Sequence, residues 1–327
     1  MKAAVIELFS LSASAFRDVP STLQPAGREA ERIAHLYWFL FWVSTAVFAI
    51  IVGLLAIASL RRRRTRTVEG ERRRARGVAV GAAISALILL VLLAVSESTG
   101  RAIVAPAGAD ALEIEVTGHQ WWWEVRYPGR SPSEQVTTAN EIHVPVGRAV
   151  RLALSSGDVI HSFWAPTMTG KKDLIPGRPT TQVFRAERPG TFPGRCAEFC
   201  GYQHAHMGFV VVAQEPREFD AWLARQRGLA AAPRDPTAAR GQSVFLAAPC
   251  VLCHTIRGAG AFGHTGPDLT HLASRSTIAA GTLPNTIGHL AGWVADSQRI
   301  KPGNRMPPNV LAANDLDDLV SYLGTLQ

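Results

Sequence analysis

Two long uncharged stretches near the N-terminus constrain the fold of this chain more than any other feature. The first covers the 25 residues 36–60 and the second covers the 19 residues 77–95. At 1.5 Å per residue, helices of these lengths span or nearly span the roughly 30 Å hydrocarbon core of a bilayer. A buried helix of a soluble domain is the alternative for the second stretch, which is rich in alanine and glycine. The sequence therefore predicts a two-helix transmembrane hairpin over residues 36–100.

A block of arginines separates the two stretches. Residues 61–76 contain nine arginines and two glutamates, so this block carries 9 − 2 = +7 of the net charge of +8. Arginine-rich loops stay on the cytoplasmic side of a membrane, so both termini are expected on the opposite side. The rest of the chain is nearly neutral, which argues against a nucleic-acid partner, whereas the spans imply contact with lipid. In the N-terminal segment 1–35, Ala13-Ser14-Ala15 resembles a signal-peptide cleavage site, although Glu7 interrupts the apolar region before it.

Residues 101–227 alternate apolar and polar side chains, as half-buried strands do. The alternation is clearest at 112–117, and Pro-Gly turns separate the short runs. Many short strands at this spacing predict a sandwich or a Greek-key barrel. Further strands are expected at 141–145, 150–154, 181–186 and 208–213, and a helix is expected from Glu215 to Gly228.

A different pattern begins after this domain. Residues 228–236 (GLAAAPRDP) read as a linker. Residues 237–327 contain helical runs near 238–246 and 316–326, with loops rich in glycine and proline between them. The sequence therefore predicts a separate, all-α domain at the C-terminal end.

Two thiols, an imidazole and a thioether lie close together near the end of the strand-rich domain. Cys196, Cys200 and His204 recur every four residues, and Met207 follows three residues later. Thiolate, imidazole and thioether together form a ligand set for copper. Two thiolates can bridge two copper ions, and a dinuclear site then needs a second histidine, which His161 can supply.

Zinc and a disulfide are the alternatives for this pair of cysteines. Zinc accepts two cysteines and a histidine but leaves the thioether of Met207 without a role. A disulfide between Cys196 and Cys200 would leave the neighbouring histidines unexplained. The motif therefore favours copper, and His206 is expected to lie outside the ligand set.

The second pair of cysteines belongs to a C-x-x-C-H motif at residues 250–254. In such a motif Cys250 and Cys253 add to the vinyl groups of a haem, and His254 takes the proximal face of the iron. Met306, the only methionine of the C-terminal domain, is expected on the distal face, held by Pro307 and Pro308. Three histidines could compete with Met306 for the distal face of the iron: His264, His271 and His289. Each is expected at the surface or facing the haem propionates.

Four segments together resemble subunit II of haem–copper cytochrome c oxidases, of the bacterial type with a fused C-terminal c-type cytochrome. They are GHQWWWEVRYP (118–128), DVIHSFWAP (158–166), KKDLIPGRP (171–179) and CAEFCGYQHAHM (196–207). The resemblance implies a cupredoxin-like Greek-key barrel followed by a class I cytochrome c domain.

The resemblance also implies particular site residues. It implies a dinuclear CuA centre whose side-chain ligands are His161, Cys196, Cys200, His204 and Met207. The backbone carbonyl of Glu198 would be a further copper ligand, and its carboxylate would bind Mg²⁺ at the interface with subunit I. One departure is clear, because relatives open the second span with a glutamate, a Trp-Thr pair and a proline. Here the segment 70–85 lacks tryptophan and proline, which leaves a role of Glu69 or Glu71 in a proton path open.

The three consecutive tryptophans 121–123 have two possible roles. Packing in the barrel core is expected for at least one of them, and the resemblance places Trp121 where electrons reach the copper domain. Residues 236–327 carry six basic and five acidic side chains, so strong electrostatic steering between the two domains is not expected. A short linker would instead keep them at high effective concentration.

The function that follows is electron transfer within a bacterial cytoplasmic (inner) membrane, with both cofactor domains on the periplasmic side. Electrons from an external cytochrome c would pass through haem c and CuA to subunit I, since neither span carries a histidine for an oxygen-reducing site. The CuA subunit of a nitric oxide reductase is the alternative, although segments 118–128 and 171–179 favour an oxidase. A periplasmic copper carrier is a third alternative, against which the covalent haem argues because storage needs no redox relay.

Overall fold

The computed structural model describes residues 21–60, 68–104 and 108–327. The chain forms two compact units. The first contains residues 31–106, and the second contains residues 107–327 and the described residues up to Ala30. The proposed cleavage site at residues 13–15 lies outside the described residues.

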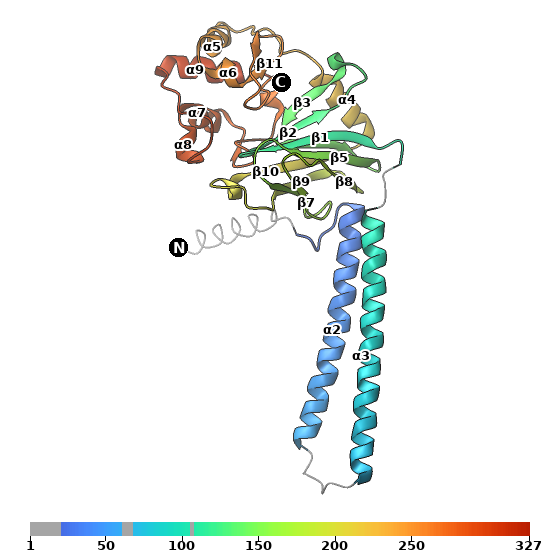
Figure 1. Ribbon diagram of the computed structural model, residues 1–327. Helices are drawn as coiled ribbons and strands as arrows, with labels where there is room; N and C mark the ends of the chain where they lie inside the picture. The colour runs from blue at the N-terminus through green and yellow to red at the C-terminus, as the bar shows by residue number, and fades with distance from the viewer. Residues whose placement is uncertain (1–20, 61–67, 105–107) are drawn as a thin grey trace, which may run out of the picture. The chain divides into compact units, whose positions relative to one another are not determined.

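The first unit is a pair of long helices, α2 (Arg28–Leu60) and α3 (Val68–Ile103) (Figure 1). Both are long and apolar enough to cross a membrane, and the apolar windows are not buried inside the protein. Exposed apolar side chains along two such helices are what lipid contact requires. The predicted hairpin is thus confirmed in its two helices.

Helix α3 begins earlier than the uncharged stretch predicted. Glu69 and Glu71 lie in its first turn, where carboxylates stabilise the positive end of the helix dipole. Glu69 also pairs with Arg73 one turn later, at 2.9 Å. The second half of the arginine block is therefore helical, since arginine is a good helix former.

The second unit begins with two five-stranded sheets that share one hydrophobic core. The pairs β1–β5 and β4–β10 are parallel, and the other pairs are antiparallel. The first sheet has the order β3 (Val136–Ala139), β2 (Trp122–Tyr127), β1 (Leu112–His119), β5 (Ala149–Ser156), β8 (Thr180–Arg185). The second has the order β4 (Glu141–Pro145), β10 (Gly208–Gln214), β9 (Gly190–Cys196), β6 (His161–Trp164), β7 (Lys172–Leu174). Each strand expected from the alternation is present, and the cupredoxin-like fold is confirmed.

Aromatic side chains fill the space between the two sheets. Trp123 is fully buried, with its ring centroid 5.3 Å from that of Phe209 and 6.2 Å from that of Phe163. A Cβ atom at Gly194 would lie 2.2 Å from the Phe209 ring, so the close packing requires glycine there. Trp123 is thus the tryptophan that forms the core, and Trp121 is only half-buried.

Helix α4 (Pro216–Gln226) follows the last strand and covers the barrel with Phe219 and Trp222. The C-terminal domain then contains α5 (Pro236–Ala247), α6 (Cys250–Cys253), α7 (Ile287–Ala295), α8 (Ser297–Ile300) and α9 (Ala313–Leu323). Its β11–β12 and β13–β14 pairs, at 255–262 and 277–284, contain only two residues in each strand.

Helices α5 and α9 cross closely in the C-terminal domain. Asp235 caps α5 by accepting a hydrogen bond from the Ala238 N–H at 3.0 Å. A Cβ atom at Gly241 would lie 1.9 Å from the Asp318 carbonyl oxygen of α9, so only glycine permits this approach. Arg240 pairs with Asp318 beside the crossing, at 2.8 Å.

The segment between α4 and α5 is bonded to the C-terminal domain. The Ala230 N–H donates to the Arg257 carbonyl at 2.8 Å, and the Gly228 carbonyl lies 3.1 Å from Nε2 of His271. His271 is buried, with Nδ1 2.8 Å from the Gln327 carbonyl. The expectation that His271 is a surface or propionate-facing residue is therefore wrong, because its ring joins the linker to the C-terminus. The domain boundaries at 100, 227 and 236 stay predictions.

Candidate metal centre and cofactor pocket

Two strands and one loop supply the predicted copper ligands. His161 begins β6, and Cys196 ends β9, which pairs with β6 in the antiparallel sense. Cys200, His204 and Met207 follow on the loop that leads into β10. The sheet therefore brings His161 next to a ligand set that is otherwise local in sequence.

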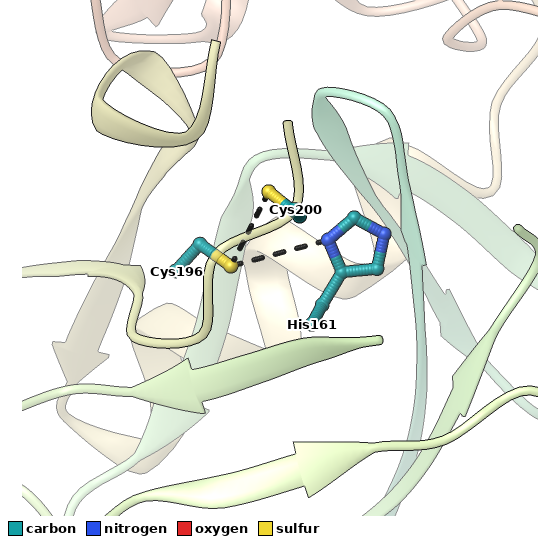
Figure 2. Close-up of side chains that lie close together, drawn as sticks. All are labelled: His161, Cys196 and Cys200. Carbon is teal, nitrogen blue, oxygen red and sulfur yellow. Dashed lines mark hydrogen bonds between the residues drawn. The ribbon is translucent and has the colours of Figure 1, made fainter. Parts of the chain in front are cut away.

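The donor atoms of these residues converge. Figure 2 shows that His161, Cys196 and Cys200 point toward one another. Sγ of Cys196 lies 3.8 Å from Sγ of Cys200 and 3.9 Å from Nδ1 of His161. Sγ of Cys200 in turn lies 3.6 Å from Nδ1 of His204 and 3.7 Å from Sδ of Met207. Each of the two thiols thus lies next to its own imidazole. Both thiols, His161 and Met207 are buried.

Glu198 contributes its backbone rather than its side chain to this cluster. Its carbonyl oxygen lies 3.2 Å from Sγ of Cys196, as a further oxygen ligand would. Its carboxylate side chain is exposed to solvent. A role of this carboxylate in binding Mg²⁺ therefore stays a prediction about a partner subunit.

Asp158 holds His161 in the orientation that a metal ligand needs. Oδ1 of Asp158 lies 2.9 Å from Nε2 of His161 and accepts a hydrogen bond from its N–H, which leaves the Nδ1 lone pair facing the thiols. Burial alone would raise the pKa of Asp158, but hydrogen bonds from His161 and from the backbone N–H of Gln120 lower it. Asp158 was not predicted from the sequence, although its place three residues before His161 was a signal.

The two thiols share protons unequally. The hydrogen bond between the two thiols lowers the pKa of Cys196, with a further contribution from His161, and raises the pKa of Cys200. Thiolates are the metal-binding form of cysteine. One thiolate is therefore already favoured at neutral pH, and metal binding would displace the second proton.

Trp121 connects this cluster with the C-terminal domain. Its indole Nε1 donates to the Cys200 carbonyl at 2.9 Å, and the side-chain amide of Gln120 donates to the same oxygen at 2.8 Å. Trp121 also lines a cavity of about 380 Å³ that belongs mainly to the C-terminal domain. Gln120 lines the same cavity, so both side chains touch both predicted cofactor sites.

The cavity is large enough for a bulky, mainly apolar group. It is lined by the C-x-x-C-H residues Cys250, Cys253 and His254 and by Met306. Many of the other lining side chains are apolar, among them Phe245, Leu269, Leu272, Ile278, Leu290 and Val294. The exposed His264 and His289 are not among the lining residues.

Both predicted axial ligands are fixed by hydrogen bonds. The Pro267 carbonyl accepts from Nδ1 of His254 at 2.8 Å, which leaves Nε2 as the free ligand atom. Burial lowers the pKa of His254, so the ring is neutral as iron ligation requires. The Met306 carbonyl accepts hydrogen bonds from Oγ of Ser297 at 2.6 Å and from Gln298 at 2.8 Å.

Arg275 supplies a buried positive charge at the same cavity. It is 8% exposed, and its Nε has no hydrogen-bond partner among the described residues. One terminal nitrogen donates to the Asp268 carbonyl. The free Nε–H group of a buried guanidinium beside a cavity can donate to an anion, which the propionates of a haem would supply. Arg275 was not predicted from the sequence because nothing local marks it.

Comparisons with known proteins identify both domains of the second unit. Residues 112–214 match the family model of the cytochrome c oxidase subunit II periplasmic domain, and residues 238–327 match that of cytochrome c. The chain is 38% identical over 225 residues to cytochrome c oxidase subunit 2 of Alkalihalophilus pseudofirmus, covering 67% of this chain and 63% of the relative. It is 43% identical over 117 residues to the Synechocystis subunit 2, covering 36% of this chain and 34% of the relative.

A solved structure is similar to the barrel. The periplasmic domain of subunit II of cytochrome oxidase from Bradyrhizobium japonicum is 31% identical, with a TM-score of 0.35, and covers 37% of this chain and 97% of that domain. The chain spans 63% of the length of the subunit 2 proteins from three bacilli that it matches.

Proposed function

Because the chain belongs to the cytochrome c oxidase subunit II family and carries a fused cytochrome c domain, we propose that electrons enter a bacterial respiratory oxidase through it. In this proposal an external cytochrome c donates to haem c, and the electrons continue through CuA to subunit I. The chain would lie in the inner membrane with its arginine block on the cytoplasmic side and both cofactor domains outside.

The convergence of six donor groups supports this proposal most directly. The two thiols lie 3.8 Å apart, and each has its own histidine, which suits two bridged copper ions better than one tetrahedral zinc. We infer that the ligands are His161, Cys196, the Glu198 carbonyl, Cys200, His204 and Met207. Met207 is the residue that a zinc site would not use.

The second cofactor site fits a haem c. We infer attachment through Cys250 and Cys253, with His254 and Met306 as axial ligands, because all four line one apolar cavity. Arg275 would neutralise a propionate there. When bound, the copper centre and the haem both supply one-electron redox chemistry. The residues of this chain would hold these groups and exclude water from them, and Asp158 and the Pro267 carbonyl orient the imidazoles of His161 and His254 for ligation.

Metal analysis and electron paramagnetic resonance on the purified complex test the proposal. Two copper ions and one covalent haem are expected in each chain, with one unpaired electron shared by both coppers in the oxidised form. One zinc ion and no copper signal would refute the copper assignment. Turnover with O₂ or with NO separates an oxidase from a nitric oxide reductase, and the subunits that co-purify identify its partners.

A further inference from the structure

Lys301 lies buried where the cytochrome domain meets the copper-ligand loop. It follows α8 and is 3% exposed. Its Nζ donates to the carbonyls of Trp121 at 3.0 Å, His206 at 2.8 Å and Ala279 at 3.2 Å. Two of these acceptors belong to the barrel and one to the cytochrome domain. One ammonium group therefore joins the two domains at the loop that carries the proposed copper ligands.

The chemistry of this contact is specific. An ammonium group has three N–H donors, and the three carbonyls match them one for one. Within the described part of the chain, no carboxylate lies within ion-pair distance of Nζ. Burial accordingly lowers the pKa of Lys301 to about 7. A buried cation without a carboxylate is tolerated only while its hydrogen bonds are complete, so the carbonyl geometry of both domains is constrained together.

A buried carboxylate makes the reciprocal contact from the barrel. Glu141, on β4, is 5% exposed. Its Oε1 accepts from the backbone N–H of Ser276 at 2.7 Å and from the Ser276 hydroxyl at 2.6 Å. Between the two anchors, the Gly208 N–H donates to the Ala280 carbonyl at 2.9 Å. Gly208 directly follows the proposed ligand Met207, so the docked segment lies against the copper loop itself.

We propose that Lys301 is a positioning residue, which with Glu141 as the opposite anchor locks the cytochrome domain onto the copper-ligand loop in one docked geometry. Electron transfer between the two cofactors then occurs from this geometry rather than after a search by a tethered domain. The transfer role rests on the proposed function, whereas the docking itself requires no metal.

Amine labelling of the full chain in the purified complex tests the docking without using activity. The chain has four lysines, and Lys171 is an exposed internal reference. Acetic anhydride at neutral pH should modify Lys301 about a hundredfold more slowly than Lys171, because modification requires the domains to separate. The lowered pKa would by itself speed the reaction, so slow labelling reports burial. Equal rates at both lysines would overturn the proposal.

Weakening the opposite anchor should expose Lys301. Glu141→Gln should raise the labelling rate of Lys301 about tenfold, because the buried charge-assisted hydrogen bonds to Ser276 are weakened. Glu187→Gln removes an exposed carboxylate of the barrel and serves as the matched control, with no change expected. An unchanged rate in Glu141→Gln would remove Glu141 as an anchor and overturn the reciprocal lock.

Flash-induced kinetics test the positioning role. Lys301→Met should slow electron transfer from haem to copper at least about tenfold while both optical and magnetic spectra stay normal. Arg299→Met removes an exposed positive charge two residues away and should transfer at the wild-type rate. Wild-type transfer in Lys301→Met would refute the positioning role. Absence of copper from the wild-type chain would instead refute the proposed function, while the labelling still decides the docking.

Discussion

Replacing Met207 by leucine separates the copper assignment from simple packing. Met207 is fully buried, and its Sδ lies 3.7 Å from Sγ of Cys200. Met168 is equally buried in the same core, which makes Met168→Leu a matched control. Because methionine and leucine are similar in volume, each substitution should lower the free energy of unfolding of the metal-free protein by less than about 1.5 kcal/mol. Packing is thus affected equally at both positions.

Only one of the two substitutions removes a proposed ligand. Met207→Leu should weaken copper binding at least about tenfold, which is the low end of what disturbing even a supporting residue does to a metal site. It should also change the copper spectrum and the reduction potential, which a thioether ligand tunes. Met168→Leu should leave the copper affinity, the copper spectrum and the reduction potential unchanged.

The assay is a copper titration followed by electron paramagnetic resonance, with denaturant unfolding of both metal-free variants as the stability control. Identical copper affinity and spectra in the two variants would refute the role of Met207 as a ligand. Loss of the copper signal in both variants would mean that core packing, rather than the thioether, decides whether the site forms.

Four further outcomes are expected. Trp121→Ala should slow electron transfer from haem to copper in flash kinetics while both cofactors stay bound, and an unchanged rate would mean that this ring only packs. Gly241→Ala should destabilise the cytochrome domain by about 1–3 kcal/mol in thermal unfolding, because its methyl group would meet a backbone carbonyl of α9 1.9 Å away. Burial alone would raise the pKa of Glu141, but hydrogen bonds from His143 and Ser276 lower it below its ordinary 4.5, so its stabilisation is present above pH 4.5 and is lost as the pH falls below that value. Denaturant unfolding should therefore show wild type more stable than Glu141→Gln by about 1–3 kcal/mol at pH 7, with the difference shrinking in acid. A cysteine placed at Arg66 should be labelled only from the cytoplasmic side and one at Ala231 only from outside, and labelling of both from one side would contradict the hairpin.

Features whose chemistry is local could be predicted from the sequence. A transmembrane span needs only an apolar stretch of sufficient length, so the two long helices were predictable, although the start of α3 at Val68 was not. The C-x-x-C-H motif and the 196–207 loop each contain most of the ligands of one site. These ligands are neighbours in the sequence, so they lie close together whatever the rest of the fold is. The alternation of strands such as β1 was equally direct, because burial on one face has a period of two.

The distant residues that complete these sites become apparent only in the folded chain. His161 reaches the cysteines because β6 pairs with β9, and Asp158 could be recognised as its support only once that pairing was known. Arg275 and Lys301 look like ordinary basic residues in the sequence, and only folding buries them. The physical reason is that burial of a charge depends on what packs around it, which residues far along the chain determine. The hydrogen bonds between the copper domain and the cytochrome domain therefore could not be predicted from any local sequence pattern.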